Sequence, residues 1–270
     1  MINYNTLNYV DDGVFIEVQL NRPQVRNAMS VEMVDELLMV LKRVEENTSC
    51  RALLLRGSGG HFCAGGDIQD MARAREKMSD NAAASRQEFV DLNRKFGVLV
   101  EAWSQAKVFT MTIVEGTALG GGLGLATASD CTWAHENAKL GMPEVTLGVI
   151  PAQILPFVVK KVGRSRAALL SLTGRRLSGA ESFDLGLVDR IFNCDEELAS
   201  GMEEIKKRIR LAAPGALRKT KELLLNIEML PLSEVLDQAA RDFAASVTGA
   251  EGLEGTMAFI EKRPPRWSEV

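Results

Sequence analysis

Two glycine-rich turns are the parts of this sequence best suited to chemistry. Ala64-Gly65-Gly66-Asp67 follows one short apolar run, and Gly120-Gly121-Gly122 follows another. Glycine lets the backbone approach a bound group closely, and the first amides of a helix have no partner within that helix. Two such turns that face each other could direct two N–H groups at one oxygen, as an oxyanion hole does. The same glycines could instead serve tight turns and close packing of helices on a sheet.

A lone carboxylate is the second feature. Glu144 lies in the mainly apolar segment Leu140 to Gly148. If this side chain is buried, its pKa should rise, which would suit it to proton transfer near neutral pH. The alternative is a solvated glutamate in a first helical turn that begins at Pro143.

The pattern of apolar residues indicates the elements that must position these groups. Buried or alternating strands are predicted at 14–20, 52–55, 108–114 and 131–134, with a helix after the N-cap Ser30 and a mostly helical stretch at 68–105. From Asp195 onward only amphipathic helices are predicted, at 195–212, 214–229, 231–247 and 249–261. We therefore predict an α/β core, residues 1–195, and a helical C-terminal region, residues 196–270.

Composition excludes several classes of function. The chain has 270 residues with 32 basic and 36 acidic side chains, so a nucleic-acid partner is not expected. Four scattered cysteines without a CxxC pair, and only two histidines, predict neither a metal site nor a disulfide framework. Uncharged runs such as 116–129 are too short to span a bilayer, and the polar, acidic N-terminus is unlike a signal peptide, so we expect a cytoplasmic protein without membrane partners.

The order of the motifs resembles that of the crotonase family of enoyl-CoA hydratases and isomerases. The segments that carry this resemblance are Asn21-Arg22-Pro23, Asn27-Ala28-Met29, His61 to Ile68, Ala118 to Gly122, Pro143-Glu144, Leu147 to Pro151, Thr173 to Arg176 and Phe259 to Arg263. The resemblance covers essentially the whole chain. It implies an α/β fold built as a spiral of ββα units, followed by a helical region that packs trimers, which often pair into hexamers.

The resemblance also assigns roles to residues. The oxyanion-hole amides would belong to Gly66 and Gly121, and Glu144 would be the acid/base. The residues implied or considered as contacts of the acyl-CoA are Arg26, Ala64, Asp67, Ile68, Gly124, Gln153, Phe259 and Lys262. Arg26, a candidate for the CoA phosphates, could equally be a solvated surface arginine. Phe259 and Lys262 would reach CoA across a subunit boundary. No metal or separate cofactor is implied, because CoA arrives as part of the substrate.

Gly124 departs from the best-known hydratases, which have a second glutamate at this position. Three alternatives are open: one carboxylate does both jobs, a substrate carboxylate or another protein group replaces the missing acid, or the reaction needs only one base, as a double-bond shift does. We expect Gly124 to leave room for a substituent at C3 of the acyl group, and to avoid a charge that would repel a substrate acid. Gln153 could orient water or a substrate carboxylate.

The segment Leu147 to Val159, together with Gly121 to Gly124, looks like that of bacterial glutaconyl-type hydratases. Those enzymes act on 3-methylglutaconyl-CoA in leucine degradation or on isohexenylglutaconyl-CoA in acyclic terpene degradation, and Pro151-Ala152-Gln153 favours the terpene branch. We therefore expect an enoyl-CoA hydratase that adds water across the 2,3 double bond of such a branched substrate. The alternatives are a Δ3,Δ2-enoyl-CoA isomerase that uses Glu144 alone and a non-catalytic acyl-CoA-binding relative.

Overall fold

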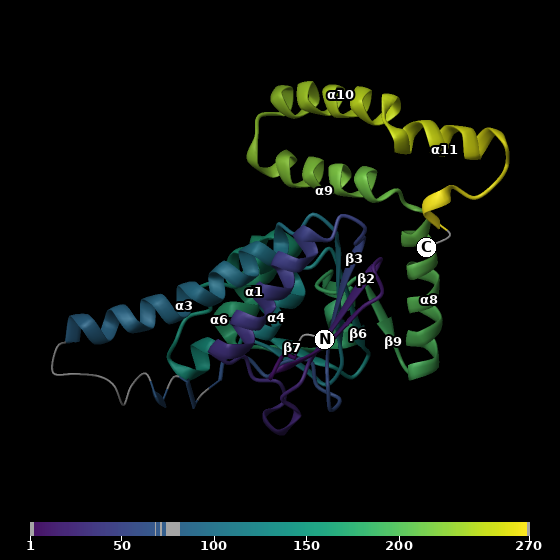
Figure 1. Cartoon of the computed structure of the whole chain (residues 1–270). Helices are drawn as coiled ribbons and strands as arrows, with labels where there is room; N and C mark the ends of the chain where they lie inside the picture. The colour runs from purple at the N-terminus through teal and green to yellow at the C-terminus, as the bar shows by residue number, and fades with distance from the viewer. Residues whose placement is uncertain (1–2, 68, 71, 74–81, 269–270) are drawn as a thin grey trace.

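The computed structural model describes residues 3–67, 69–70, 72–73 and 82–268 (Figure 1). Part of the helical stretch predicted at 68–105 lies outside these residues. The described part of that stretch contains helix α3 (Ala82–Ser104).

A six-stranded sheet forms the centre of the molecule, in the order β1-β2-β3-β4-β6-β9. Its strands are β1 (Leu7–Asp11), β2 (Phe15–Leu20), β3 (Ala52–Gly57), β4 (Phe109–Val114), β6 (Cys131–His135) and β9 (Arg190–Phe192). β1 and β2 are antiparallel, and all other neighbours are parallel. The four predicted strands are confirmed as β2, β3, β4 and β6. Parallel strands that are covered on both faces are typically continuous apolar runs. The central strands could therefore be predicted from the sequence.

A second layer of short strands positions the site. It contains β5 (Thr117–Leu119), β7 (Lys139–Gly141) and β8 (Arg176–Ser178), with β5 parallel to β7. Two isolated parallel bridges, Met29 to Gly66 and Cys63 to Ala118, extend this layer. Cys63, Ala118 and Leu140 therefore lie side by side, on segments that run in the same direction.

Helices pack on both faces of the central sheet. On one face lie α1 (Val31–Glu46), α3, α4 (Gly121–Thr127), α5 (Leu155–Val162) and α6 (Arg164–Thr173), whose apolar residues form the main core with those of the sheet. The predicted cap of the first helix is confirmed, since Ser30 Oγ accepts a hydrogen bond from the Met33 amide at 3.2 Å. The remaining short helices are η1 (Pro23–Val25), η2 (Glu144–Leu147), α7 (Gly179–Leu185) and η3 (Arg266–Ser268).

The C-terminal helices are α8 (Asp195–Leu211), α9 (Pro214–Met229), α10 (Leu232–Thr248) and α11 (Ala250–Ile260), close to the predicted ranges. The predicted division at residue 195 falls at the start of α8. That helix still packs on the sheet, where Leu198 and Ile209 join Phe15 and Trp133 in a second apolar cluster. α9 to α11 stand apart from the sheet (Figure 1). Lys221 of α9 forms an ion pair with Asp130, which ties this helix to the core.

Within the described residues, no helix has the length and apolar character needed to cross a membrane. The same residues contain no group of His, Cys, Asp or Glu side chains arranged to hold a metal ion.

Candidate active site

Both glycine turns and Glu144 meet at one edge of the second layer. The bridge from Cys63 to Ala118 and the pairing of β5 with β7 bring the three segments together. A Cβ atom built on Gly120 would stand 2.9 Å from Glu144 Oε1 and 3.8 Å from the Cα atom of Gly65. The structure thus places the carboxylate beside the residues that precede Gly66 and Gly121.

The amides of Gly66 and Gly121 lie outside the backbone hydrogen bonds of their neighbours. The Met29 amide donates to the Gly65 carbonyl at 2.8 Å, and the Asp67 amide donates to the Met29 carbonyl at 3.0 Å. In a parallel bridge these bonds flank Gly66, whose own amide therefore points away from Met29. Gly121 is the first residue of α4, so its amide has no acceptor within the helix. Both N–H groups can therefore donate to a bound oxygen.

Gly120 precedes Gly121 in this turn and has a structural role of its own. Its φ of 51° and ψ of −120° are accessible to glycine and strained for other residues. Its amide donates to the Gly141 carbonyl at 3.0 Å, which joins the two strands that lead into the site. A side chain here would also collide with the Glu144 carboxylate. The run of three glycines was the signal in the sequence.

Glu144 is the first residue of η2 and is half-buried. Its Oε2 atom is fully buried and has no hydrogen-bond partner among the described residues. Burial raises the pKa of this carboxyl group, and its own backbone amide offsets part of that rise. A buried carboxylate without a partner is unusual in a structural role and is typical of a group that transfers protons. The solvated alternative does not hold for this side chain.

Asp67 and Arg22 fix the turn that carries Gly66. Asp67 is only 7% exposed, and Arg22 Nη1 lies 2.7 Å from Asp67 Oδ2. The same Nη1 donates to the Ala28 carbonyl at 2.7 Å, and Asp67 Oδ1 accepts from the Gln69 amide at 2.9 Å. Burial alone would raise the pKa of Asp67, but the hydrogen bonds from Arg22 and from the Gln69 amide, together with the nearby positive charges, outweigh burial and hold the pKa below its usual range. In the sequence, Arg22 stands out only as part of the motif Asn21-Arg22-Pro23. The structure gives it this positioning role.

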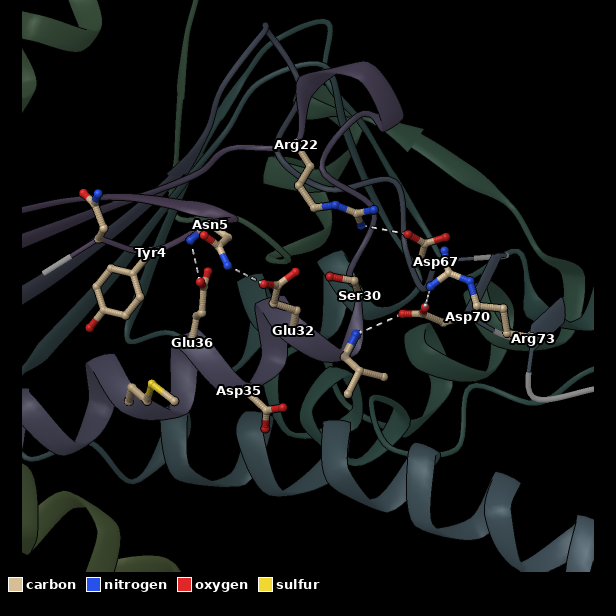
Figure 2. A pocket seen from close by; sticks show the side chains of 13 residues that line it. Tyr4, Asn5, Arg22, Ser30, Glu32, Asp35, Glu36, Asp67, Asp70 and Arg73 are labelled. Atoms are coloured by element: carbon tan, nitrogen blue, oxygen red, sulfur yellow. Dashed lines mark hydrogen bonds and ion pairs between the residues drawn. The ribbon is translucent and has the colours of Figure 1, made fainter. Parts of the chain in front are cut away.

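A polar cavity of about 770 Å³ borders the turn that contains Asp67 (Figure 2). It is lined by Asn3, Tyr4, Asn5, Arg22, Ser30, Val31, Glu32, Asp35, Glu36, Met39, Asp67, Asp70 and Arg73. Its carboxylates are engaged within the fold: Glu36 accepts from the Asn5 amide at 2.6 Å, and Asp70 accepts from the Val31 amide at 3.0 Å. Glu144, Gly66 and Gly121 are not among the residues that line this cavity, so it is separate from the candidate site.

The space beside Gly124 is filled. A Cβ atom at this position would stand 2.2 Å from Ile154 Cγ2, and Ile154 is buried. The prediction that Gly124 leaves room for a substituent on the acyl chain is therefore wrong, because Ile154 occupies that room. No local sequence signal pairs these two residues, which come together only when α5 packs on α4.

Gln153 lies between α3 and the start of α5. Its Nε2 donates to Asn93 Oδ1 at 2.8 Å, and its Oε1 would be 2.0 Å from a Cβ atom at Gly97. The residue before Gly97 is Phe96, whose ring would lie 3.1 Å from a Cβ atom at Gly121. α3 therefore packs over the first turn of α4, and Gln153 lies at the edge of this contact.

The remaining residues implied in CoA binding are distributed over two regions. Arg26 is exposed, and its carbonyl accepts from the Ala64 amide at 3.0 Å, so these two are neighbours. Ile68 lies outside the described residues. Phe259 and Lys262 are exposed at the end of α11, which Figure 1 shows well apart from α4. A single chain therefore does not bring these last two residues to Glu144.

Known proteins resemble this chain over nearly its whole length. A family model described as enoyl-CoA hydratase/isomerase matches residues 11–270. An enoyl-CoA hydratase/isomerase from Marinobacter aquaeolei is 44% identical with a TM-score of 0.93, and the match covers 97% of this chain and 99% of that one. Pseudomonas aeruginosa AtuE is 46% identical with a TM-score of 0.93, over 98% of this chain and 100% of that one.

A more distant relative is named for a different reaction. The peroxisomal Delta(3,5)-Delta(2,4)-dienoyl-CoA isomerase of Arabidopsis thaliana is 31% identical over 284 aligned residues, which cover 100% of this chain and 99% of that protein. The predicted α/β crotonase fold and the predicted enzyme of the enoyl-CoA hydratase type are confirmed. The chain belongs to the enoyl-CoA hydratase/isomerase family.

Proposed function

We propose that this protein is a hydratase that adds water across the 2,3 double bond of a branched, glutaconyl-type enoyl-CoA. The observation that carries the proposal is the position of Glu144, whose Oε1 would lie 2.9 Å from a Cβ atom at Gly120, beside the first amide of α4. A thioester oxygen held by the Gly66 and Gly121 amides would leave the reacting carbons within reach of this carboxylate.

The proposed reaction needs one carboxylate. Ionised Glu144 takes a proton from water while the water oxygen bonds to C3, and the electron pair of the double bond moves towards the thioester oxygen. The two amides stabilise the negative charge on that oxygen, and one such donor is worth on the order of 3 kcal/mol. Protonated Glu144 then returns its proton to C2. We propose no resident metal or cofactor, because CoA enters as part of the substrate.

The polar residues around Gly97 support a substrate with a distal acid. Gln153 Oε1 and Arg94 Nη1 would lie 2.0 Å and 2.8 Å from a Cβ atom at Gly97, and Asn93 bonds to the Gln153 amide. Ile154, next to Gln153 in the chain, is the residue that packs on Gly124. A distal carboxylate of the acyl group that reached Gly97 would meet this amide and the guanidinium of Arg94, whose Nη2 also pairs with Glu101 at 2.7 Å. The substrates we propose are isohexenylglutaconyl-CoA, from acyclic terpene degradation, or 3-methylglutaconyl-CoA, from leucine degradation.

A Δ3,Δ2-enoyl-CoA isomerase is the second candidate. A double-bond shift needs one base that removes a proton from one carbon and returns it to another, and Glu144 is the carboxylate that the structure places at the glycine turns. The similarity to the Arabidopsis isomerase also favours this candidate.

We propose in addition that the protein self-associates as a trimer or hexamer through α9 to α11. The apolar side chains exposed on these helices are Leu224, Ile227, Met229, Leu232, Leu236, Phe243, Val247, Leu253, Met257, Phe259 and Ile260. Exposed apolar area of this kind usually marks an interface. A neighbouring copy would bring Phe259 and Lys262 near the CoA of another subunit.

The decisive experiment compares three substrates with the pure protein. 3-Methylglutaconyl-CoA, isohexenylglutaconyl-CoA and crotonyl-CoA are each incubated with it, and both the conjugated double bond and the product mass are followed. Gain of one water, fastest with a glutaconyl ester, supports the proposal. An unchanged mass with a moved double bond, in a test with 3-enoyl esters, supports the isomerase. No turnover of any ester would favour the non-catalytic relative.

A further inference from the structure

Glu144 and Ile154 lie against the same stretch of α4. The Gly124 amide donates to the Gly120 carbonyl at 3.0 Å, so these two glycines are one turn apart. Gly120 meets the Glu144 carboxylate, and Gly124 meets Ile154, whose Cγ2 and Cβ atoms would be 2.2 Å and 2.8 Å from an added Cβ atom. Ile154 is thus the next side chain along the helix from the carboxylate.

Ile154 is firmly held in this position. It is 3% exposed and belongs to the main core. Its carbonyl accepts from the amides of Phe157 at 3.1 Å and Val158 at 3.2 Å, which fixes its backbone at the start of α5. A β-branched side chain has few accessible rotamers, and the Cγ2 and Cβ atoms in contact with Gly124 are close to the backbone. Ile154 therefore cannot move aside at small cost.

We infer that Ile154 is a positioning residue that makes this a site with one carboxylate. Its side chain fills the space in which any side chain at position 124 would stand, and it thereby excludes a second acid from the part of α4 next to Glu144. The inference goes one step beyond the proposed function, because it takes Glu144 as the proton-transfer group and says why Glu144 acts alone. Residues 124 and 154 should then be coupled, so that a carboxylate at 124 is accepted only when residue 154 is small.

A double-mutant cycle tests the inference by activity. Gly124→Glu, Ile154→Ala and the double variant are compared with the wild type for kcat and KM in the hydration of crotonyl-CoA. We expect Gly124→Glu alone to lower kcat at least about tenfold, because the new side chain displaces Ile154 or the first turn of α4. The double variant should exceed Gly124→Glu by about tenfold or more, within the range of coupling between contacting residues. Effects on kcat that simply multiply would overturn the inference.

A second cycle tests the packing without activity. Gly124→Ala is made in the wild type and in the Ile154→Ala background, and urea unfolding midpoints are measured. We expect Gly124→Ala to lower the midpoint clearly in the wild type and much less in the Ile154→Ala background. Ile16→Ala is the matched control, because Ile16 is equally buried in the main core but lies on β2. In that background the loss from Gly124→Ala should be undiminished.

The two cycles separate the inference from the proposed function. If the wild type turns over none of the esters, the proposed function fails, and the urea cycle still decides whether Ile154 and Gly124 are coupled. If the wild type is active but midpoint losses add equally in the Ile154→Ala and Ile16→Ala backgrounds, Ile154 has no positioning role and the inference fails alone.

Discussion

The carboxyl group of Glu144 combines three properties that are rarely found together in a structural glutamate. One oxygen is fully buried without a partner among the described residues, burial raises its pKa, and it faces a glycine where any side chain would collide with it. Conversion of the carboxylate to an amide keeps its shape and removes its ability to accept and return a proton. The residue can therefore be tested with little change in packing.

We predict that Glu144→Gln lowers kcat by on the order of 10²–10⁴-fold. Affinity for a saturated acyl-CoA should remain close to that of the wild type, because the amides that hold the thioester oxygen are unchanged. Steady-state kinetics and calorimetric titration with butyryl-CoA measure the two effects. Full activity in this variant would remove Glu144 from the mechanism.

The raised pKa of Glu144 predicts a pH dependence of both activity and stability. Hydration needs the ionised form, so kcat/KM should fall as the pH is lowered through a value above 4.5, the ordinary value of the group. The folded state favours the protonated form, so the stability contributed by this group is present below its unfolded pKa and is lost as the pH rises through its folded pKa. Glu144→Gln should therefore melt at a higher temperature than the wild type at neutral pH, and the difference should shrink in acid. A difference in melting temperature that grows in acid would contradict this sign.

At the scale of elements, the short parallel strands of the second layer bring the segments of the candidate site together. Their carboxyl ends deliver residues 65–66, 120–121 and 144 to one edge. The first of these turns depends on a side-chain contact, since the ion pair of Arg22 and Asp67 joins it to the segment before α1.

We predict that Asp67→Asn lowers kcat through movement of the Gly66 amide and destabilises the fold by roughly 1–3 kcal/mol, because Arg22 is left without its buried partner. Glu115→Gln is the matched control. Glu115 pairs with Arg56 at 2.9 Å, but this pair is more exposed, and its loss should cost about 0–1 kcal/mol. Urea unfolding and turnover of both variants check the prediction. Equal effects of the two substitutions would assign Asp67 no special role.

The sequence was informative where a pattern extends over many residues. The strands at the centre of the sheet are uninterrupted apolar runs, and the four C-terminal helices have regular apolar spacing with Pro214 at a helix start, so both were predictable. Strands β5, β7 and β8 have only three residues each and are stabilised by tertiary pairing, which no local pattern reveals. The contact of Ile154 with Gly124 and the ion pair of Arg22 with Asp67 also depend on distant segments. The sequence therefore indicated the segments of the candidate site better than it indicated the tertiary contacts that hold these segments in place.

At the scale of the whole molecule, the core and the C-terminal helices differ in how their apolar residues are covered. Each face of the sheet has its own buried cluster. On α10, in contrast, Leu236 is 59% exposed and Phe243 is 71% exposed. This contrast is the basis for expecting contacts between copies of the chain.

We predict that the protein is larger than a monomer by light scattering, and that the double substitution Leu236→Lys and Phe243→Lys shifts it towards the monomer. The circular dichroism spectrum should be retained, because neither side chain is part of a core cluster. Lys207→Glu on α8 is a control for altered charge outside these helices. A monomeric wild type would refute the proposed assembly.

The last described residues of the chain lie beside the end of α8, just before helices α9 to α11 begin. Trp267 Nε1 donates to the Leu211 carbonyl at 3.0 Å, and Arg51, just before β3, donates to the Trp267 carbonyl at 2.6 Å. Residues 212–266 therefore begin and end at the same place, where Leu211 and Trp267 are hydrogen-bonded to each other. A short linker across this gap would cost little closure entropy, so residues 212–266 could be replaced without a change in the path of the remaining chain, with the loss of the ion pair between Lys221 and Asp130.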